Sequence, residues 1–77
     1  MWQGMMEVHV THLTAAVVPA GDVVHIQPFL VSVDAAPRPL MSEVYRRREV
    51  VLKVRALAEL HGVPMAPGLE KQLRRIG

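Results

Sequence analysis

The sequence contains no cysteine, no asparagine and only three aromatic residues among 77. A chain without cysteine forms neither a disulfide nor a thiolate metal site, so no redox role is expected. Three aromatic side chains are too few for the stacked platform on which many proteins hold single-stranded RNA. A chain of this length forms one domain, 1–77, whose small core leaves a thin margin of stability. Self-association is therefore the expected additional source of stability.

Long hydrophobic runs are also missing. The apolar stretches, such as 15–18 and 29–31, fall far short of the ~20 residues that cross a bilayer. The first Lys or Arg is Arg38, so the start of the chain lacks the basic region of a signal peptide. We expect no membrane contact and a cytoplasmic location, or a place in the virion for a phage structural protein.

The start and the composition of the chain suggest where it comes from. Met5 and Met6 follow Met1 closely, so residues 1–4 are predicted to be an extension outside the fold. Seven of the nine basic residues are Arg, valine occurs 13 times and asparagine is absent. This profile is typical of proteins from GC-rich bacterial or phage genomes.

Charge is divided unevenly along the chain. Residues 1–37 contain three acidic residues and no Lys or Arg, whereas residues 38–77 contain all nine basic residues and only four acidic ones. Oppositely charged halves can meet between neighbouring subunits, and a basic half can bind a polyanion. Both interpretations predict a macromolecular partner.

Residues 5–34 are predicted to form a long β-hairpin. Val and Thr dominate this segment, and Pro19-Ala20-Gly21-Asp22 is typical of a turn. With residues 20 and 21 at the tip, Val10 faces Val31 and His12 faces Phe29. Apolar positions change side near residues 11–12 and 27–28, which predicts a bulge or kink in each strand and a bent hairpin. A short antiparallel meander of four strands is the alternative.

Two helices are expected after a proline-rich linker over 34–39. The first spans 40–61, with Ser42 as a plausible N-cap and Gly62 just past its end. A short helix follows over 67–76, with Pro67 at its first position. The predicted fold class is therefore α+β: a long bent hairpin, or a short meander, followed by one long and one short helix.

The expected long helix carries two apolar stripes on nearly opposite sides. The first consists of Val44, Val50, Val51, Val54, Leu57 and Ala58, and the second of Tyr45, Leu52, Ala56 and Leu60. A helix that is apolar on two sides must be covered on two sides, and one hairpin covers only one of them. The second stripe is therefore the predicted protein interface, in a homo-oligomer or with another protein.

No constellation of residues points to catalysis or to a cofactor. The four histidines (His9, His12, His25 and His61) are not spaced to converge on one metal ion. Ser32 and Ser42 lack the surroundings of a nucleophile, and no glycine-rich phosphate loop is present. We predict no catalytic residue, no metal ligand and no cofactor, and hence a protein that is not an enzyme.

The basic half supports a nucleic-acid alternative. Its phosphate-binding candidates are Arg46, Arg47, Arg48, Lys71, Arg74 and Arg75. Three consecutive arginines on a helix point about 100° apart, so they cannot form one patch alone. The same residues could equally line a solvated face or meet an acidic neighbour.

Residues 56–76 also resemble a helix-turn-helix. Ala58 and Gly62 stand where that motif prefers a small residue and a turn glycine, and Val63 follows. The pattern departs from the motif at Pro64 and Pro67, and the apolar anchor comes one residue late. The resemblance implies a DNA-binding regulator whose groove-facing residues are Glu70, Lys71, Arg74 and Arg75. This regulator is the alternative to a non-enzymatic interaction or assembly module of bacterial or phage origin, which the sequence favours.

Overall fold

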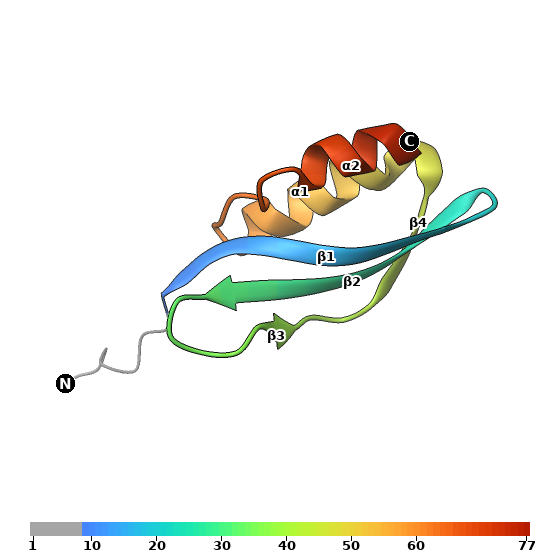
Figure 1. Cartoon of the computed structure of the whole chain (residues 1–77). Coiled ribbons are helices and arrows are strands. Elements are labelled where there is room, and N and C mark those ends of the chain that lie inside the picture. Colours follow the sequence, from blue (N-terminus) through green and yellow to red (C-terminus); the bar gives the residue numbers. More distant parts are fainter. Residues whose placement is uncertain (1–8) are drawn as a thin grey trace.

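A computed structural model describes residues 9–77 (Figure 1). The expected extension over residues 1–4, and the predicted start of the hairpin at residue 5, lie outside this part of the chain. The elements are β1 (Val10–Ala20), β2 (Val23–Ser32), β3 (Arg38–Pro39), β4 (Glu43–Arg46), the 3-10 helix η2 (Arg47–Glu49), α1 (Val50–Leu60) and α2 (Leu69–Ile76). The α+β class, with a hairpin followed by a longer and a shorter helix, is confirmed.

The sheet is three strands wide. β1 and β2 form the antiparallel hairpin, and β3 and β4 both pair with the other edge of β2. The side-chain amide of Gln27 holds the segment between β3 and β4: it donates to Leu40 O at 2.9 Å and to Pro28 O at 3.0 Å. The hydroxyl of Ser42 donates to Gln27 Oε1 at 2.5 Å. Ser42 therefore belongs to the sheet margin and is not a helix N-cap.

The hairpin turn lies one residue later than predicted. Ala20 pairs with Val23, so residues 21 and 22 form the turn. Gly21 has φ +63°, the positive value that a type II′ hairpin turn places at its first central residue. In consequence His12 pairs with Val31 and not with Phe29. The position of the glycine that can adopt positive φ sets the register.

One of the two predicted irregularities is present. The register between β1 and β2 shifts between Val10 and His12, which confirms a bulge near residues 11–12. The kink expected at 27–28 is wrong, because Pro28 pairs with Ala15 in continuous register. Proline has no N–H to donate, and its carbonyl accepts from Leu40 N at 2.9 Å, so Pro28 is compatible with this position. Its buried ring simply continues the apolar row of β2.

The first helix begins later than the predicted residue 40. Residues 43–46 form strand β4, and the helix starts with η2 before continuing as α1. Val44 and Tyr45 are good strand formers, and backbone pairing with β2 overrides the helical periodicity read from their positions. The predicted end is right, since Gly62 follows α1 with φ +70°. The second helix starts at Leu69, after Gly68 with φ +84°.

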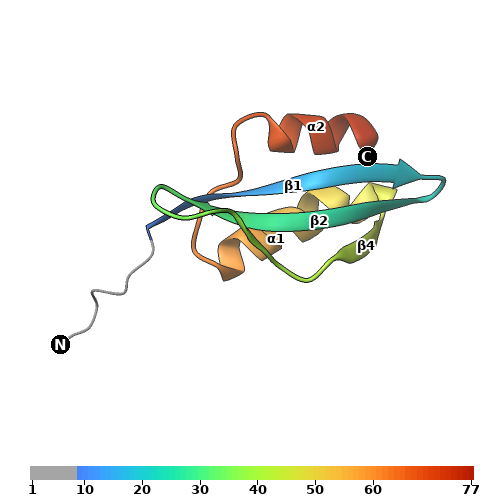
Figure 2. The ribbon, with the colours of Figure 1, turned by 60° about the horizontal axis from the view of Figure 1, so that its bottom comes forward.

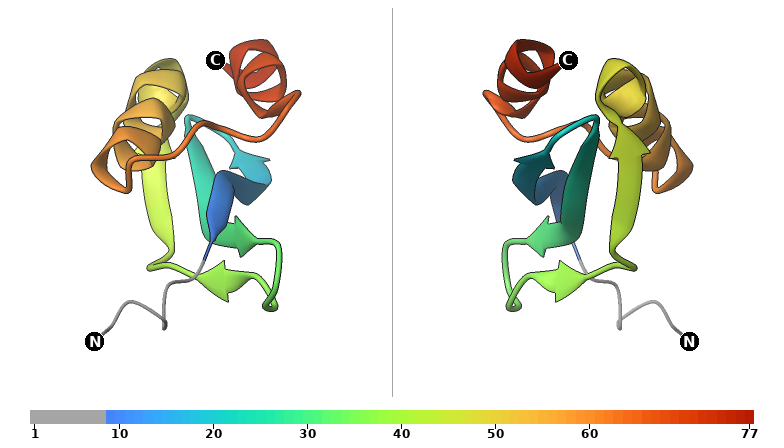
Figure 3. Two further views of the ribbon diagram at one scale, coloured as in Figure 1. Left: turned by 90° about the vertical axis from the view of Figure 1, so that its left-hand side faces the viewer. Right: turned by 90° about the vertical axis from the view of Figure 1, so that its right-hand side faces the viewer.

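Both helices lie on one face of the sheet. α1 and α2 run side by side in opposite directions (Figure 1), and both cover the same side in the end views of Figure 3. Figure 2 shows α2 beside β1, with α1 behind β2 and β4. Between the layers lies the buried core of Leu13, Val24, Ile26, Leu30, Val50, Val54, Ala58, Leu69 and Leu73. Val50, Val54 and Ala58 of the first predicted stripe supply the part of the core that comes from α1, and Val51 and Leu57 pack against it. The prediction was wrong for Val44, which lies on β4 and is exposed.

Candidate interaction surfaces

The side of α1 that faces away from the sheet carries a row of apolar residues that the described part of the chain leaves uncovered. Leu52 is 65% exposed and Leu60 is 78% exposed, and Ala56 between them is also exposed. These three residues, spaced four apart, lie on one side of the helix. We call them the outer α1 stripe. It contains three of the four residues predicted as a protein interface.

Tyr45 does not belong to this stripe. It lies on β4 opposite Val24 and packs, half-buried, against the core. Burial raises the pKa of its phenol, and the nearby carboxylate of Glu43 raises it further. The predicted grouping with the stripe was wrong because it required helix at residues 43–46.

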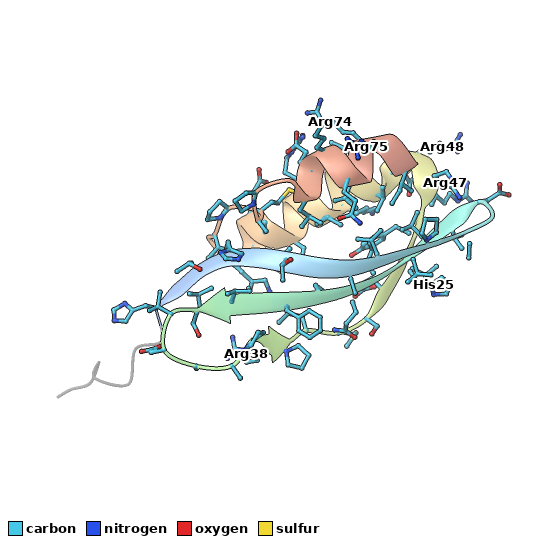
Figure 4. All side chains as sticks on the ribbon, viewed as in Figure 1. His25, Arg38, Arg47, Arg48, Arg74 and Arg75 are labelled. Atoms are coloured by element: carbon cyan, nitrogen blue, oxygen red, sulfur yellow. The ribbon has the colours of Figure 1, made fainter. Side chains whose placement is uncertain are left out.

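A second apolar surface covers the side of the sheet away from the helices. Strand side chains alternate between faces, so the neighbours of the buried residues point outward. This outer sheet face is largely apolar but includes polar residues and one arginine: it consists of His12, Thr14, Ala16, Val18, Ala20, Val23, His25, Gln27, Phe29, Val31, Pro39, Val44 and Arg46. At its centre His25 pairs with Val18 on one side and Val44 on the other, and its imidazole points away from the helices (Figure 4).

This face was not predicted from the sequence. The predicted kink at 27–28 assigned Phe29 and Val31 to a side that would become buried at one end of a bent hairpin. In the structure β2 stays in register, so its buried residues all share one side and these two share the other. Counting proline as an apolar member of the alternation would have shown the uncovered face.

Arg47 is held by the fold. Its Nε and Nη2 atoms donate to Gly21 O at 3.0 and 2.7 Å, and Nη1 donates to Ile76 O at 3.2 Å. Its backbone N–H donates to Asp22 O at 2.9 Å. The side chain thus joins the hairpin turn to the last turn of α2, where a cation is also favoured by the helix dipole.

Arg74 is also engaged within the chain. It hydrogen-bonds to Glu70 four residues earlier, and Arg55 of α1 lies 3.1 Å from the same carboxylate. The hydrogen bonds from Arg74 and Arg55 lower the pKa of Glu70. Glu70 therefore links the two helices.

Of the six predicted phosphate-binding residues, only Arg74 forms an ion pair within residues 9–77, and Arg47 is held by backbone carbonyls. The other four form no ion pair there: Arg46, Arg48, Lys71 and Arg75. Two of these, Arg46 and Arg48, line an open hollow of about 590 Å³ together with Asp22, Val23 and Arg47. Figure 4 shows Arg47 and Arg48 at the turn end of the hairpin, near the end of α2. The positive charge of this end is partly offset by the Asp22 carboxylate.

The resemblance to a helix-turn-helix is not realised in the structure. Residues 61–68 separate the two helices and hydrogen-bond to β1, with Leu13 N donating to Pro64 O at 2.9 Å and Ala66 N donating to Leu13 O at 2.8 Å. A helix-turn-helix needs a turn of about three or four residues and helices at about 90–120°. The two prolines of the connection suit an extended segment along the strand, which directs α2 back alongside α1.

The hydroxyl groups considered as nucleophiles serve structural roles. Ser32 donates to Ala35 O at 3.4 Å, and Ser42 donates to Gln27. No group of three or more His, Asp or Glu side chains is placed to hold a metal ion within the described part of the chain. Neither α1 nor α2 has the length and hydropathy of a bilayer-spanning helix.

Comparisons with protein-family models, with curated proteins and with solved structures gave no significant match to this chain.

Proposed function

We propose that this protein is a non-enzymatic interaction module that self-associates through the outer α1 stripe. The observation that carries this proposal is the exposure of Leu52 and Leu60 on a helix whose opposite side forms the core. Burying apolar surface of this kind contributes about 25 cal/mol per Å². A chain with so small a core gains most from covering it.

The stripe is suited to a second copy of the same helix running in the opposite direction. Leu52 and Leu60 lie four residues before and four residues after Ala56. When two copies of the helix run in opposite directions, Leu52 of one copy therefore lies against Leu60 of the other, and Ala56 lies against Ala56. Alanine lets two helix backbones approach closely, and rows of residues spaced four apart interdigitate at a crossing angle near −50°.

The charges beside the stripe do not oppose this pairing. Lys53 and Glu59 are exposed and lie three residues on either side of Ala56. Chain reversal brings Lys53 of one copy to the level of Glu59 in the other, so these two opposite charges attract each other across the contact. Like charges directly opposed across an interface would be unfavourable.

This proposal extends to the biological role expected from the sequence. A small assembly, structural or inhibitor protein of a bacterium or phage acts through the surfaces it presents and needs no catalytic centre. Its place of action would be the cytoplasm or the virion. The compact core and the exposed stripe support this role.

Single-cysteine cross-linking tests the contact directly, because the chain has no cysteine of its own. Under mild oxidation at micromolar concentration, Ala56→Cys should form a disulfide-linked dimer, since residue 56 faces its counterpart at the centre of the contact. Gln72→Cys, exposed on α2 and away from the stripe, is the matched control. Equal or absent cross-linking in the two variants would contradict the contact, as would a stable wild-type monomer in light scattering across a dilution series.

Nucleic-acid binding is a second candidate, supported by the free arginines around the hollow at the turn end. Arg48→Gln should weaken binding to a short DNA duplex and lower the salt dependence by about one phosphate contact. Arg74→Gln is the control, because Arg74 is paired with Glu70. Fluorescence anisotropy between about 0.05 and 0.2 M salt measures both, and the absence of binding at low salt would exclude this candidate.

A further inference from the structure

We infer that the outer sheet face is a second self-association surface, on which a second copy packs its own outer sheet face to form a two-sheet sandwich. This contact is separate from the one proposed for α1, and the two surfaces lie on opposite layers of the molecule. It stands on the composition, the hydrogen bonding and the area of the face.

The composition of the face differs from that of a sheet in contact with water. A solvated sheet face normally alternates polar residues outward. Here Val18 is 59% exposed and Val44 is 54% exposed, with Phe29 and Val31 half-buried beside them. The face contains no carboxylate and no lysine, and its one charged residue is Arg46.

The polar groups of the face are compatible with being covered. Both amide hydrogens of Gln27 and its carbonyl oxygen are already bonded to Leu40, Pro28 and Ser42. A neutral imidazole is both a donor and an acceptor, so a two-fold axis near His25 lets the two copies of this residue bond to each other. Covering the face then leaves few polar groups without a partner.

The area of the face is close to the lower limit for a dimer. Strand β2 has 10 residues, which gives a length of about 33 Å, and three rows of strands give a width of about 14 Å. These dimensions give roughly 450 Å² of flat surface per copy, or about 900 Å² for the pair, without the extra area that protruding side chains add. This total approaches the ~1,000 Å² expected of a biological interface. Two sheets packed in this way lie about 10 Å apart with their strands near −30° to each other.

A second copy fits this surface better than a charged partner does. The one residue of the face with a fixed charge is Arg46, which lies opposite Val23 at its edge and offers little to an oppositely charged partner. An isologous contact requires a surface that matches itself, and a largely apolar face with its one cation away from the centre meets that condition. Together with the α1 contact, it would build assemblies larger than a dimer.

Four proteins separate the two contacts: the wild type, Val44→Lys, Leu60→Glu and the double variant, with Gln72→Lys as a control that adds charge away from both surfaces. Sedimentation velocity at about 50 μM should give the largest particle for the wild type and the control, dimers for each single variant and a monomer for the double variant. Each Val44→Lys dimer across the sheet face would bury two unpaired ammonium groups, so its dissociation constant should rise at least about 100-fold.

The outcomes distinguish this inference from the proposed function. If Val44→Lys leaves the wild-type particle unchanged, the sheet contact is wrong while the α1 contact stands. If Leu60→Glu leaves the wild-type particle unchanged and Val44→Lys does not, the α1 contact is wrong while the sheet contact stands. Val18→Lys, on β1, repeats the test from another strand, and circular dichroism verifies that each variant is folded. A folded Val18→Lys variant with the wild-type mass would also overturn the inference.

Discussion

The two faces of the hairpin are both apolar, yet only one is covered. On the inner face Val24 and Ile26 are fully buried under the helices, whereas on the outer face Val18 and Val44 remain more than half exposed. Valine occurs on both faces, but the polar side chains of His25 and Gln27 lie on the outer face of the hairpin. The helices pack on the more apolar face.

This comparison shows that hydrophobic alternation does not identify a core by itself. In a sheet with one wet face, the outward positions are mostly polar, whereas here Val18, Val31 and Val44 lie among the polar ones. Both faces of the hairpin, and likewise both sides of α1, carry apolar side chains. Within one copy, packing between the helices and the sheet buries the inner face of the sheet and the inner side of α1. The two proposed self-contacts use the apolar surfaces that remain exposed.

The largest difference in stability is expected between two alanine substitutions, one on each face of the sheet. Ile26→Ala on the inner face should lower the free energy of unfolding by about 2–5 kcal/mol, because it leaves a cavity in the packed core. Val44→Ala on the outer face should cost the isolated monomer only about 0.5 kcal/mol. Urea unfolding at a concentration below dimer formation measures both, and similar losses would mean that the faces do not differ.

A smaller effect is expected at the end of the molecule where the helices meet the hairpin turn. Arg47→Met keeps much of the length of the side chain but removes the hydrogen bonds to Gly21 O and Ile76 O. The expected loss is about 1–3 kcal/mol, since two carbonyls lose charged donors. Arg48→Met is the control, and thermal unfolding followed by circular dichroism compares them. Equal stability of the two variants would contradict the structural role of Arg47.

Much of the fold could be predicted because its signals are local. The end of α1 at Gly62, the bulge near residues 11–12 and the buried stripe of Val50, Val54 and Ala58 all follow from residue type and spacing. These features depend on backbone conformation and periodicity within one segment. The prediction that Leu52 and Leu60 form an interface rests on the same periodicity.

The features that could not be predicted depend on contacts far apart in the sequence. Strand β4 exists because Tyr45 pairs with Val24 across the sheet, and this pairing overrides a helical pattern. The role of Arg47 depends on carbonyls 26 and 29 residues away. An arginine run shows charge, but only the packed structure shows which guanidinium is already occupied.

A further, smaller effect on stability is expected at the hairpin turn. The turn fixes the register of β1 and β2, and the register determines which side chains lie on the inner face and which on the outer face. Gly21→Ala should cost about 1–2 kcal/mol, because φ +63° is unfavourable for a residue with a Cβ, although no atom lies within 4 Å of that position. Gly21→Asn should cost less, since asparagine tolerates this region better. Urea unfolding ranks the three proteins, and an alanine variant as stable as the wild type would mean that the turn differs from the one described.

The smallest effect is expected from the link between the two helices that cover the inner face. The hydrogen bonds from Arg74 and Arg55 lower the pKa of Glu70, so the folded chain favours its carboxylate. The resulting stabilisation is present above the pKa of the unfolded chain and disappears as the pH falls through the lower, folded value. It is small, because Glu70 is exposed to solvent and salt. Wild type and Glu70→Gln should therefore differ slightly in melting temperature at pH 7 and converge near pH 2, while a gap that persists in acid would show that Glu70 acts through packing and not through its charge.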